Sequence, residues 1–78
     1  MLYRIHCVDT GETVTRKRRD AARLVLQNMV YRKIASHGGL DTSWGHRIMA
    51  LADGADVTKG GDISCDQFTI IYTPSRVG

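Results

Sequence analysis

The sequence predicts a small α+β protein: an N-terminal β-hairpin, two helices and a C-terminal strand (ββααβ), with both helices on one face of a three-stranded sheet. The chain has 78 residues, which is enough for one compact domain over residues 1–78. Apolar residues alternate near both ends, as in half-buried strands, and recur every three or four positions in the middle, as in an amphipathic helix. Each helix needs an apolar surface to pack on, and the sheet provides it.

The first element is a β-hairpin. In its first strand Tyr3, Ile5 and Cys7 point to one side, and the residues between them point to the other. Residues 9–12 contain a glycine and turn formers, so they predict a tight turn. Residues 13–15 are β-prone and continue the hairpin as its second strand.

The strongest periodic signal runs from about Arg18 to His37. Its apolar residues recur at spacings of three and four and define one side of a helix: Ala22, Val25, Leu26, Met29, Val30 and Ile34. Two glycines and Leu40 follow, which predicts a Schellman end with Gly38 in the left-handed conformation.

A second, shorter helix is predicted to end at Asp53, with its N-cap among residues 41–43. Gly45 weakens the helical pattern, so a strand over residues 46–52 is the alternative. Residues 53–62 are rich in Gly and Asp and predict an exposed loop.

The last element is a strand over residues 63–73, with Phe68, Ile70 and Tyr72 on one face and Pro74 at its end. An antiparallel pair of helices would leave this strand antiparallel to the second strand and parallel to the first. If the first and last strands are neighbours, the sheet is mixed and the second strand lies outside the first.

The charge of the chain is concentrated in one segment. The formal net charge is +3, but residues 16–33 hold seven Lys or Arg against one Asp, a local balance of +6, and the rest of the chain carries −3. Four of these cations are consecutive, at the predicted junction of hairpin and helix: Arg16, Lys17, Arg18 and Arg19. A helix N-terminus favours anions, so this run suits an external phosphate or carboxylate, with Arg23 one turn further on. The alternative is that the four side chains simply extend into solvent.

The long helix has further apolar residues opposite its main stripe, namely Leu24, Tyr31 and Ala35, with Asn28 beside them. The interpretation we favour from the sequence is that the short helix packs there, because a small core needs its apolar residues. The other is a protein interface formed by Leu24, Tyr31 and Arg32, for a partner protein or for a second copy of the chain in a homodimer.

The sequence predicts no catalytic residues, no metal site and no cofactor. No two Cys or His residues have the short spacing of a structural zinc site, and no phosphate-binding loop is present. A secretory signal and an apolar run of ~20 residues are also missing, so we expect a cytoplasmic protein without a membrane partner. The two cysteines, Cys7 and Cys65, are then expected to be reduced.

Two functions fit these observations. The first is a non-enzymatic binding protein that uses its basic strand–helix junction to engage nucleic acid or a nucleoprotein complex. The second is a protein-interaction module that docks on an acidic or nucleic-acid-binding surface of a host protein and modulates it. In size, basic balance and lack of a catalytic signature, the chain is similar to small accessory proteins of phages and plasmids.

Overall fold

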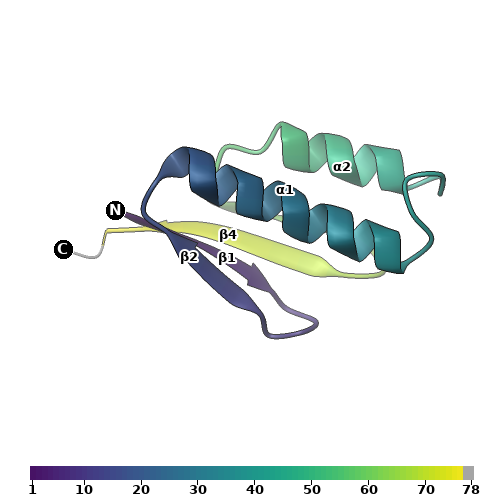
Figure 1. The fold of residues 1–78 in the computed structure, drawn as a ribbon, viewed down its shortest axis with the longest axis horizontal. Coiled ribbons are helices and arrows are strands. Elements are labelled where there is room, and N and C mark those ends of the chain that lie inside the picture. Colours follow the sequence, from purple (N-terminus) through teal and green to yellow (C-terminus); the bar gives the residue numbers. More distant parts are fainter. Residues whose placement is uncertain (77–78) are drawn as a thin grey trace.

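A computed structural model describes residues 1–76 and contains six elements in the order ββααββ. Both helices lie on the same face of a single sheet (Figure 1), as the sequence predicts. The elements are β1 (Leu2–Cys7), β2 (Thr13–Arg16), α1 (Arg19–Ser36), α2 (Gly45–Asp53), β3 (Gly61–Ser64) and β4 (Thr69–Ser75).

The sheet has four strands in the order β2-β1-β4-β3, and every neighbouring pair is antiparallel. Ile5 in the central strand β1 lies opposite Val14 of β2 and Tyr72 of β4. Ile63 lies opposite Ile70 across β3 and β4. The predicted three-stranded, mixed sheet is therefore wrong.

The error comes from the segment predicted as one strand over residues 63–73, which forms the hairpin β3–β4. Its turn is closed by the Cys65 N–H, which donates to the Phe68 carbonyl at 2.9 Å. β3 does run antiparallel to β2, as a pair of antiparallel helices requires. The hairpin then returns the chain between β1 and β3, so that β4 is antiparallel to both.

Pro74 does not end the last strand, which continues to Ser75. The Val8 N–H donates to the Thr69 carbonyl at 3.0 Å, so odd-numbered residues of β4 bond to β1 and even-numbered ones face β3. β3 begins at Gly61, opposite Tyr72, so the nitrogen of Pro74 faces a position that β3 does not reach. The strand therefore tolerates a residue that has no N–H.

Helix α1 confirms the predicted stripe: its buried residues are Ala22, Leu26, Met29, Val30 and Ile34, and Val25 is half-buried. Its end also follows the prediction, because Gly38 has φ +113° and the Gly39 N–H donates to the Ile34 carbonyl at 2.9 Å. Leu40 then folds back against the core.

Residues 45–53 form helix α2, so the alternative of a strand is wrong. The N-cap of α2 is Trp44, so the prediction of an N-cap among residues 41–43 is wrong. Thr42 instead stabilises the turn that leads into the helix: its Oγ1 accepts from the Gly45 N–H at 3.1 Å and donates to the Gly39 carbonyl at 2.9 Å. α2 contributes Ile48 and Ala52 to the core.

The core lies between the helices and the inner face of the sheet. The prediction that Phe68, Ile70 and Tyr72 share a face is confirmed, since the first two are buried and the third is half-buried. Cys7 is buried, Cys65 is half-buried, and both are free thiols. Within residues 1–76, neither helix combines the length and apolar character needed to cross a membrane.

Candidate functional site

The four consecutive cations lie where strand β2 passes into helix α1. β2 ends at Arg16 and α1 begins at Arg19, and all four side chains are exposed. Arg18 is the N-cap residue in an extended conformation, and no side chain caps the helix. The first turn of α1 contains one acidic residue, Asp20. Because no side chain caps the helix, the free N–H groups of this turn point toward the same region as the cations.

These cations have few partners within the chain. The Arg16 guanidinium donates to the neighbouring Thr15 carbonyl at 2.8 Å. Arg19 Nε lies 3.9 Å from Asp20 Oδ1, but both side chains are exposed, and such pairs contribute little. Among the residues that the structure describes, no carboxylate lies within ion-pair distance of Arg16, Lys17 or Arg18.

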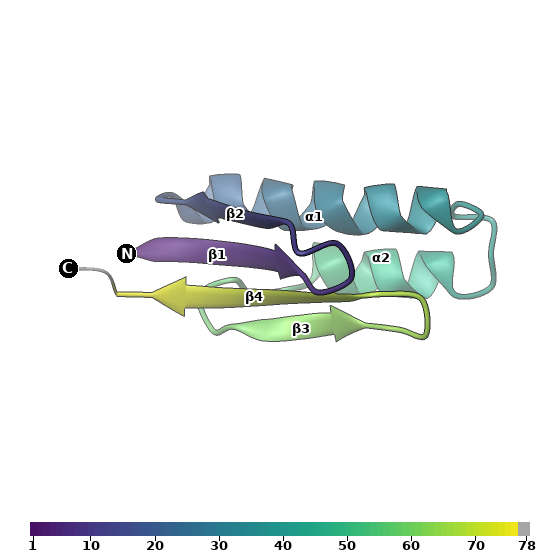
Figure 2. The same cartoon turned by 90° about the horizontal axis from the view of Figure 1, so that it is seen from below.

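The sheet brings two further arginines to the same end of the molecule (Figure 2). The start of β1, the end of β2 and the end of β4 lie together there. Arg4 lies opposite Thr15 and Thr73, and Arg76 follows Ser75, which pairs with Leu2 at the N-terminus. We call the resulting cluster the basic end: Arg4, Arg16, Lys17, Arg18, Arg19 and Arg76. Sequence reasoning missed Arg4 and Arg76, because only the strand register brings them to the other four.

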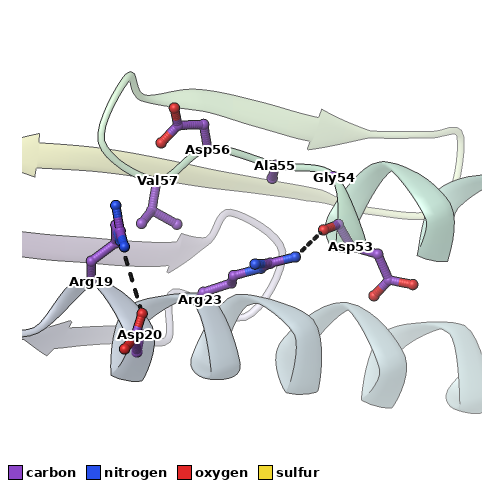
Figure 3. Close-up of a pocket in the computed structure, with 8 residues that line it drawn as sticks. All are labelled: Arg19, Asp20, Arg23, Asp53, Gly54, Ala55, Asp56 and Val57. Atoms are coloured by element: carbon purple, nitrogen blue, oxygen red, sulfur yellow. Dashed lines mark hydrogen bonds and ion pairs between the residues drawn. The ribbon is translucent and has the colours of Figure 1, made fainter.

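Arg23, one of the predicted binding residues, makes a contact within the fold. Its Nη2 donates to the backbone carbonyl of Asp53, the last residue of α2 (Figure 3). The C-terminal carbonyls of a helix lack partners within the helix and carry partial negative charge. Arg23 thus caps the end of α2 and links the two helices.

Arg23 crosses a cleft of about 400 Å³ between the start of α1 and residues 53–57 (Figure 3). Its lining includes two cations, Arg19 and Arg23, and three carboxylates, those of Asp20, Asp53 and Asp56. Hydrogen bonds from the Thr58 side chain and backbone hold the pKa of Asp56 below its usual value, and the charges of Lys59 and Arg19 lower it further. Because its three carboxylates outnumber its two cations, the cleft is not suited to an anion.

A second hollow, of about 350 Å³, is better suited to a phosphate group. It lies at the start of α1 and is lined by Tyr3, Arg18, Arg19, Asp20 and Thr58. Its lining has two arginines and two hydroxyl residues, whose donors commonly contact phosphates, against one carboxylate, that of Asp20. Tyr3 and Thr58 come from β1 and from the loop before β3, so the sequence contains no local signal for them.

The second apolar group on α1 is not covered by the short helix, which corrects the interpretation favoured from the sequence. Leu24 is 59% exposed and Tyr31 is 51% exposed. Figure 2 shows α1 at the edge of the helix layer, beside β2, with α2 on its other side. On that other side, Arg23 binds the C-terminal end of α2, and the first residue of α2, Gly45, lies against Ile34. α2 is therefore held away from Leu24 and Tyr31. The third predicted interface residue, Arg32, forms an ion pair with Glu12, in which Arg32 Nη2 lies 3.6 Å from Glu12 Oε1.

The histidines do not form a metal centre in the part of the chain that the structure describes: within residues 1–76, no three His, Cys, Asp or Glu side chains are grouped to hold a metal ion. His6 Nδ1 is 2.7 Å from the Thr13 hydroxyl, and the His37 ring stacks on Phe68 at 6.4 Å. Comparison with protein-family models, curated proteins and solved structures finds no match to this chain.

Because Arg23 caps α2, replacing it should affect stability more than replacing the neighbouring Arg18 does. We expect Arg23→Ala to lower the free energy of unfolding by about 0.5–1.5 kcal/mol, the usual contribution of one hydrogen bond. For a nucleic-acid ligand held by the consecutive cations, it should weaken binding less than Arg18→Ala does. Urea unfolding followed by circular dichroism measures the first effect, and fluorescence anisotropy with a labelled duplex measures the second. Equal stability of the two variants would contradict the capping role.

Proposed function

We propose that this protein is a non-enzymatic binding protein that grips the phosphate backbone of nucleic acid with its basic end. The observation that carries the proposal is the run of four exposed cations where β2 passes into an uncapped helix N-terminus, with Arg4 on β1 and Arg76 after β4 exposed at the same end of the domain. Three of them, Arg16, Lys17 and Arg18, have no carboxylate partner among the described residues. Contacts of this kind account for most non-specific affinity for nucleic acid.

The position of the charge supports this function more than its amount does. Cations at the first turn of a helix oppose the helix dipole, at a cost of about 0.3–1 kcal/mol each. An arrangement that works against folding stability is easier to understand if the same charges serve a ligand. The hollow at Tyr3 and Arg18 offers hydroxyl and guanidinium donors for one phosphate group, and Arg4 and Arg76 extend the surface for its neighbours.

A second candidate function is a phage- or mobile-element-type module that docks on an acidic or nucleic-acid-binding surface of a host protein. The exposed Leu24 and Tyr31 favour it, because Tyr and Arg often dominate protein interfaces. We favour nucleic acid as the partner because the hollow at the start of α1 is bordered by charged and hydroxyl residues, whereas Leu24 and Tyr31 lie further along the helix.

Salt dependence tests the proposed function. With three to six phosphate contacts, the logarithm of the association constant should fall with the logarithm of salt concentration with a slope of about −3 to −5. Affinity for a labelled duplex should then drop by about 10²–10³-fold between 50 and 200 mM salt. Fluorescence anisotropy measures the slope. Failure to bind either DNA or RNA at the lowest salt would remove nucleic acid as the partner and favour the acidic protein surface.

A further inference from the structure

Strand β2 is an edge of the sheet, and β1 is its one neighbour within residues 1–76 (Figure 2). The Cys7 N–H donates to the Glu12 carbonyl at 2.8 Å. Because hydrogen bonds alternate along an antiparallel ladder, even-numbered residues of this segment bond to β1 and odd-numbered ones face outward. The backbone N–H and C=O groups of Thr13 and Thr15 therefore point away from the sheet. Such groups on an edge are a template for pairing with another strand.

The side chains along this edge are complementary to themselves. The segment reads Glu-Thr-Val-Thr-Arg from Glu12 to Arg16, with an acid at one end, a base at the other and a threonine on each side of Val14. Two antiparallel copies centred on Val14 place Glu12 of each opposite Arg16 of the other, and Thr13 opposite Thr15. Opposite charges and threonines in directly facing positions are favourable pairs. Centring the pair on Thr13 or Thr15 instead would place Val14 opposite a charged residue.

We propose that two copies of the chain pair through β2 about a two-fold axis at Val14, which joins their sheets into one continuous sheet. Thr13 and Thr15 of each copy exchange backbone hydrogen bonds with Thr15 and Thr13 of the other. In the single chain the Thr15 carbonyl accepts from the Arg16 guanidinium at 2.8 Å. In the dimer a backbone N–H takes that place, which frees the guanidinium for Glu12 of the other copy. The same patch serves both copies, as an isologous interface requires.

A groove beside the open edge gives the added strand an apolar surface as well as hydrogen bonds. The groove has a volume of about 430 Å³ and lies between β2 and α1. Its apolar lining is formed by Val14, Val25 and Tyr31, of which the first two are half-buried and the third is exposed. In the paired sheets Val14 of the second copy lies directly opposite Val14, at the border of this groove. The apolar side chains of the two copies then shield one another from water.

Disulfide trapping tests the register. We expect Val14→Cys, in a Cys65→Ser background, to form a covalent dimer under mild oxidation. The residue at the axis faces its counterpart with the two Cα atoms about 4.5 Å apart, which a disulfide can span. Thr15→Cys in the same background is the matched control, because its counterpart lies two residues along the strand, about 9 Å away and beyond that reach. Equal cross-linking at both positions, or none at position 14, would overturn the proposed register.

Exchanging the two charges tests the pairing without cysteines. Glu12→Arg should weaken self-association about 10-fold or more, because both charge pairs across the axis become repulsive. Arg16→Glu should have the same effect, and Glu12→Arg/Arg16→Glu should restore self-association, since opposite charges face each other again. Lys17→Glu is the control: it changes the net charge as Arg16→Glu does, outside the paired segment, and should leave self-association within a few-fold of the wild type.

Sedimentation equilibrium measures self-association in the absence of nucleic acid, so its outcome is independent of the proposed function. A double variant as weak as either single variant would overturn the pairing, as would a wild-type chain that is monomeric at every concentration. A strand from another protein is the alternative occupant of this edge. A labelled peptide with the sequence of residues 11–17 that binds a strictly monomeric chain would overturn the second copy in favour of that occupant.

Discussion

Replacing Lys17 and Arg18 by Glu should reduce the affinity for duplex DNA by at least about 10²-fold at 100 mM salt. Each lost phosphate contact removes nearly one unit from the slope against salt, and reversal adds repulsion to the loss. The same double variant should be as stable as the wild type or slightly more stable. Glu at the N-cap and just before it, beside the first turn of α1, interacts favourably with the helix dipole, by about 0.3–1 kcal/mol per residue.

The variant is informative because its affinity for DNA should fall while its stability stays the same or rises. A general loss of positive charge is controlled by Ser43→Glu/Arg47→Glu/Ala50→Glu, which changes the net charge equally at exposed positions around α2. The α1–α2 connection and the start of α2 lie at the end of the molecule remote from the start of α1 (Figure 1). We expect the control to bind DNA within a few-fold of the wild type. Equal weakening by the two variants would show that net charge, rather than the basic end, determines binding.

Gly45→Ala should destabilise the fold by about 2–3 kcal/mol, although alanine is the better helix former by about 1 kcal/mol. A Cβ atom at this position would lie 2.8 Å from the Gly39 carbonyl oxygen and 2.8 Å from Thr42 Oγ1. Both atoms belong to the α1–α2 connection, where they hydrogen-bond to each other at 2.9 Å. Relieving the clash means disrupting this connection, so steric overlap should outweigh helix propensity.

The measurement is thermal unfolding, and a loss of this size should lower the midpoint by about 10–20 °C in a domain of this length. Gly54→Ala is the matched control, because its Cβ would lie 3.5 Å from the nearest atom, the Ala50 carbonyl oxygen, in ordinary contact. That variant should melt close to the wild type. A Gly45→Ala protein that is more stable than the wild type would show that the turn can rearrange without cost.

The sequence predicts those elements whose periodicity is local and strong. The buried stripe of α1, its glycine end and the N-terminal hairpin all follow from residues close together in the chain. The hairpin β3–β4 does not, because its turn over residues 65–68 contains neither Gly nor Pro, and Phe68 continues the apolar pattern through it. Without that turn, the direction of the last strand and the strand order could not be obtained.

The residues of the candidate site also fall into those that the sequence predicts and those that only the fold brings together. The consecutive cations are visible in the sequence, but Arg4 and Arg76 join them only through the register of β1 with β2 and β4. Arg23 is one helical turn from the run and looks like part of it, yet its guanidinium reaches the end of α2. Such a contact depends on how two helices pack, which spacing within one helix does not reveal.

The claim that the basic end binds nucleic acid is tested most directly by mapping the contact residue by residue. We expect ¹⁵N–¹H NMR titration with a short DNA duplex to shift the amide signals of Arg4, residues 16–20 and Arg76, together with that of Thr58 beside the hollow. The hairpin turn at residues 9–12 and the connection at residues 41–43, at the other end of the domain, should stay unchanged. Shifts confined to those distant segments, with the basic end unperturbed, would contradict the account.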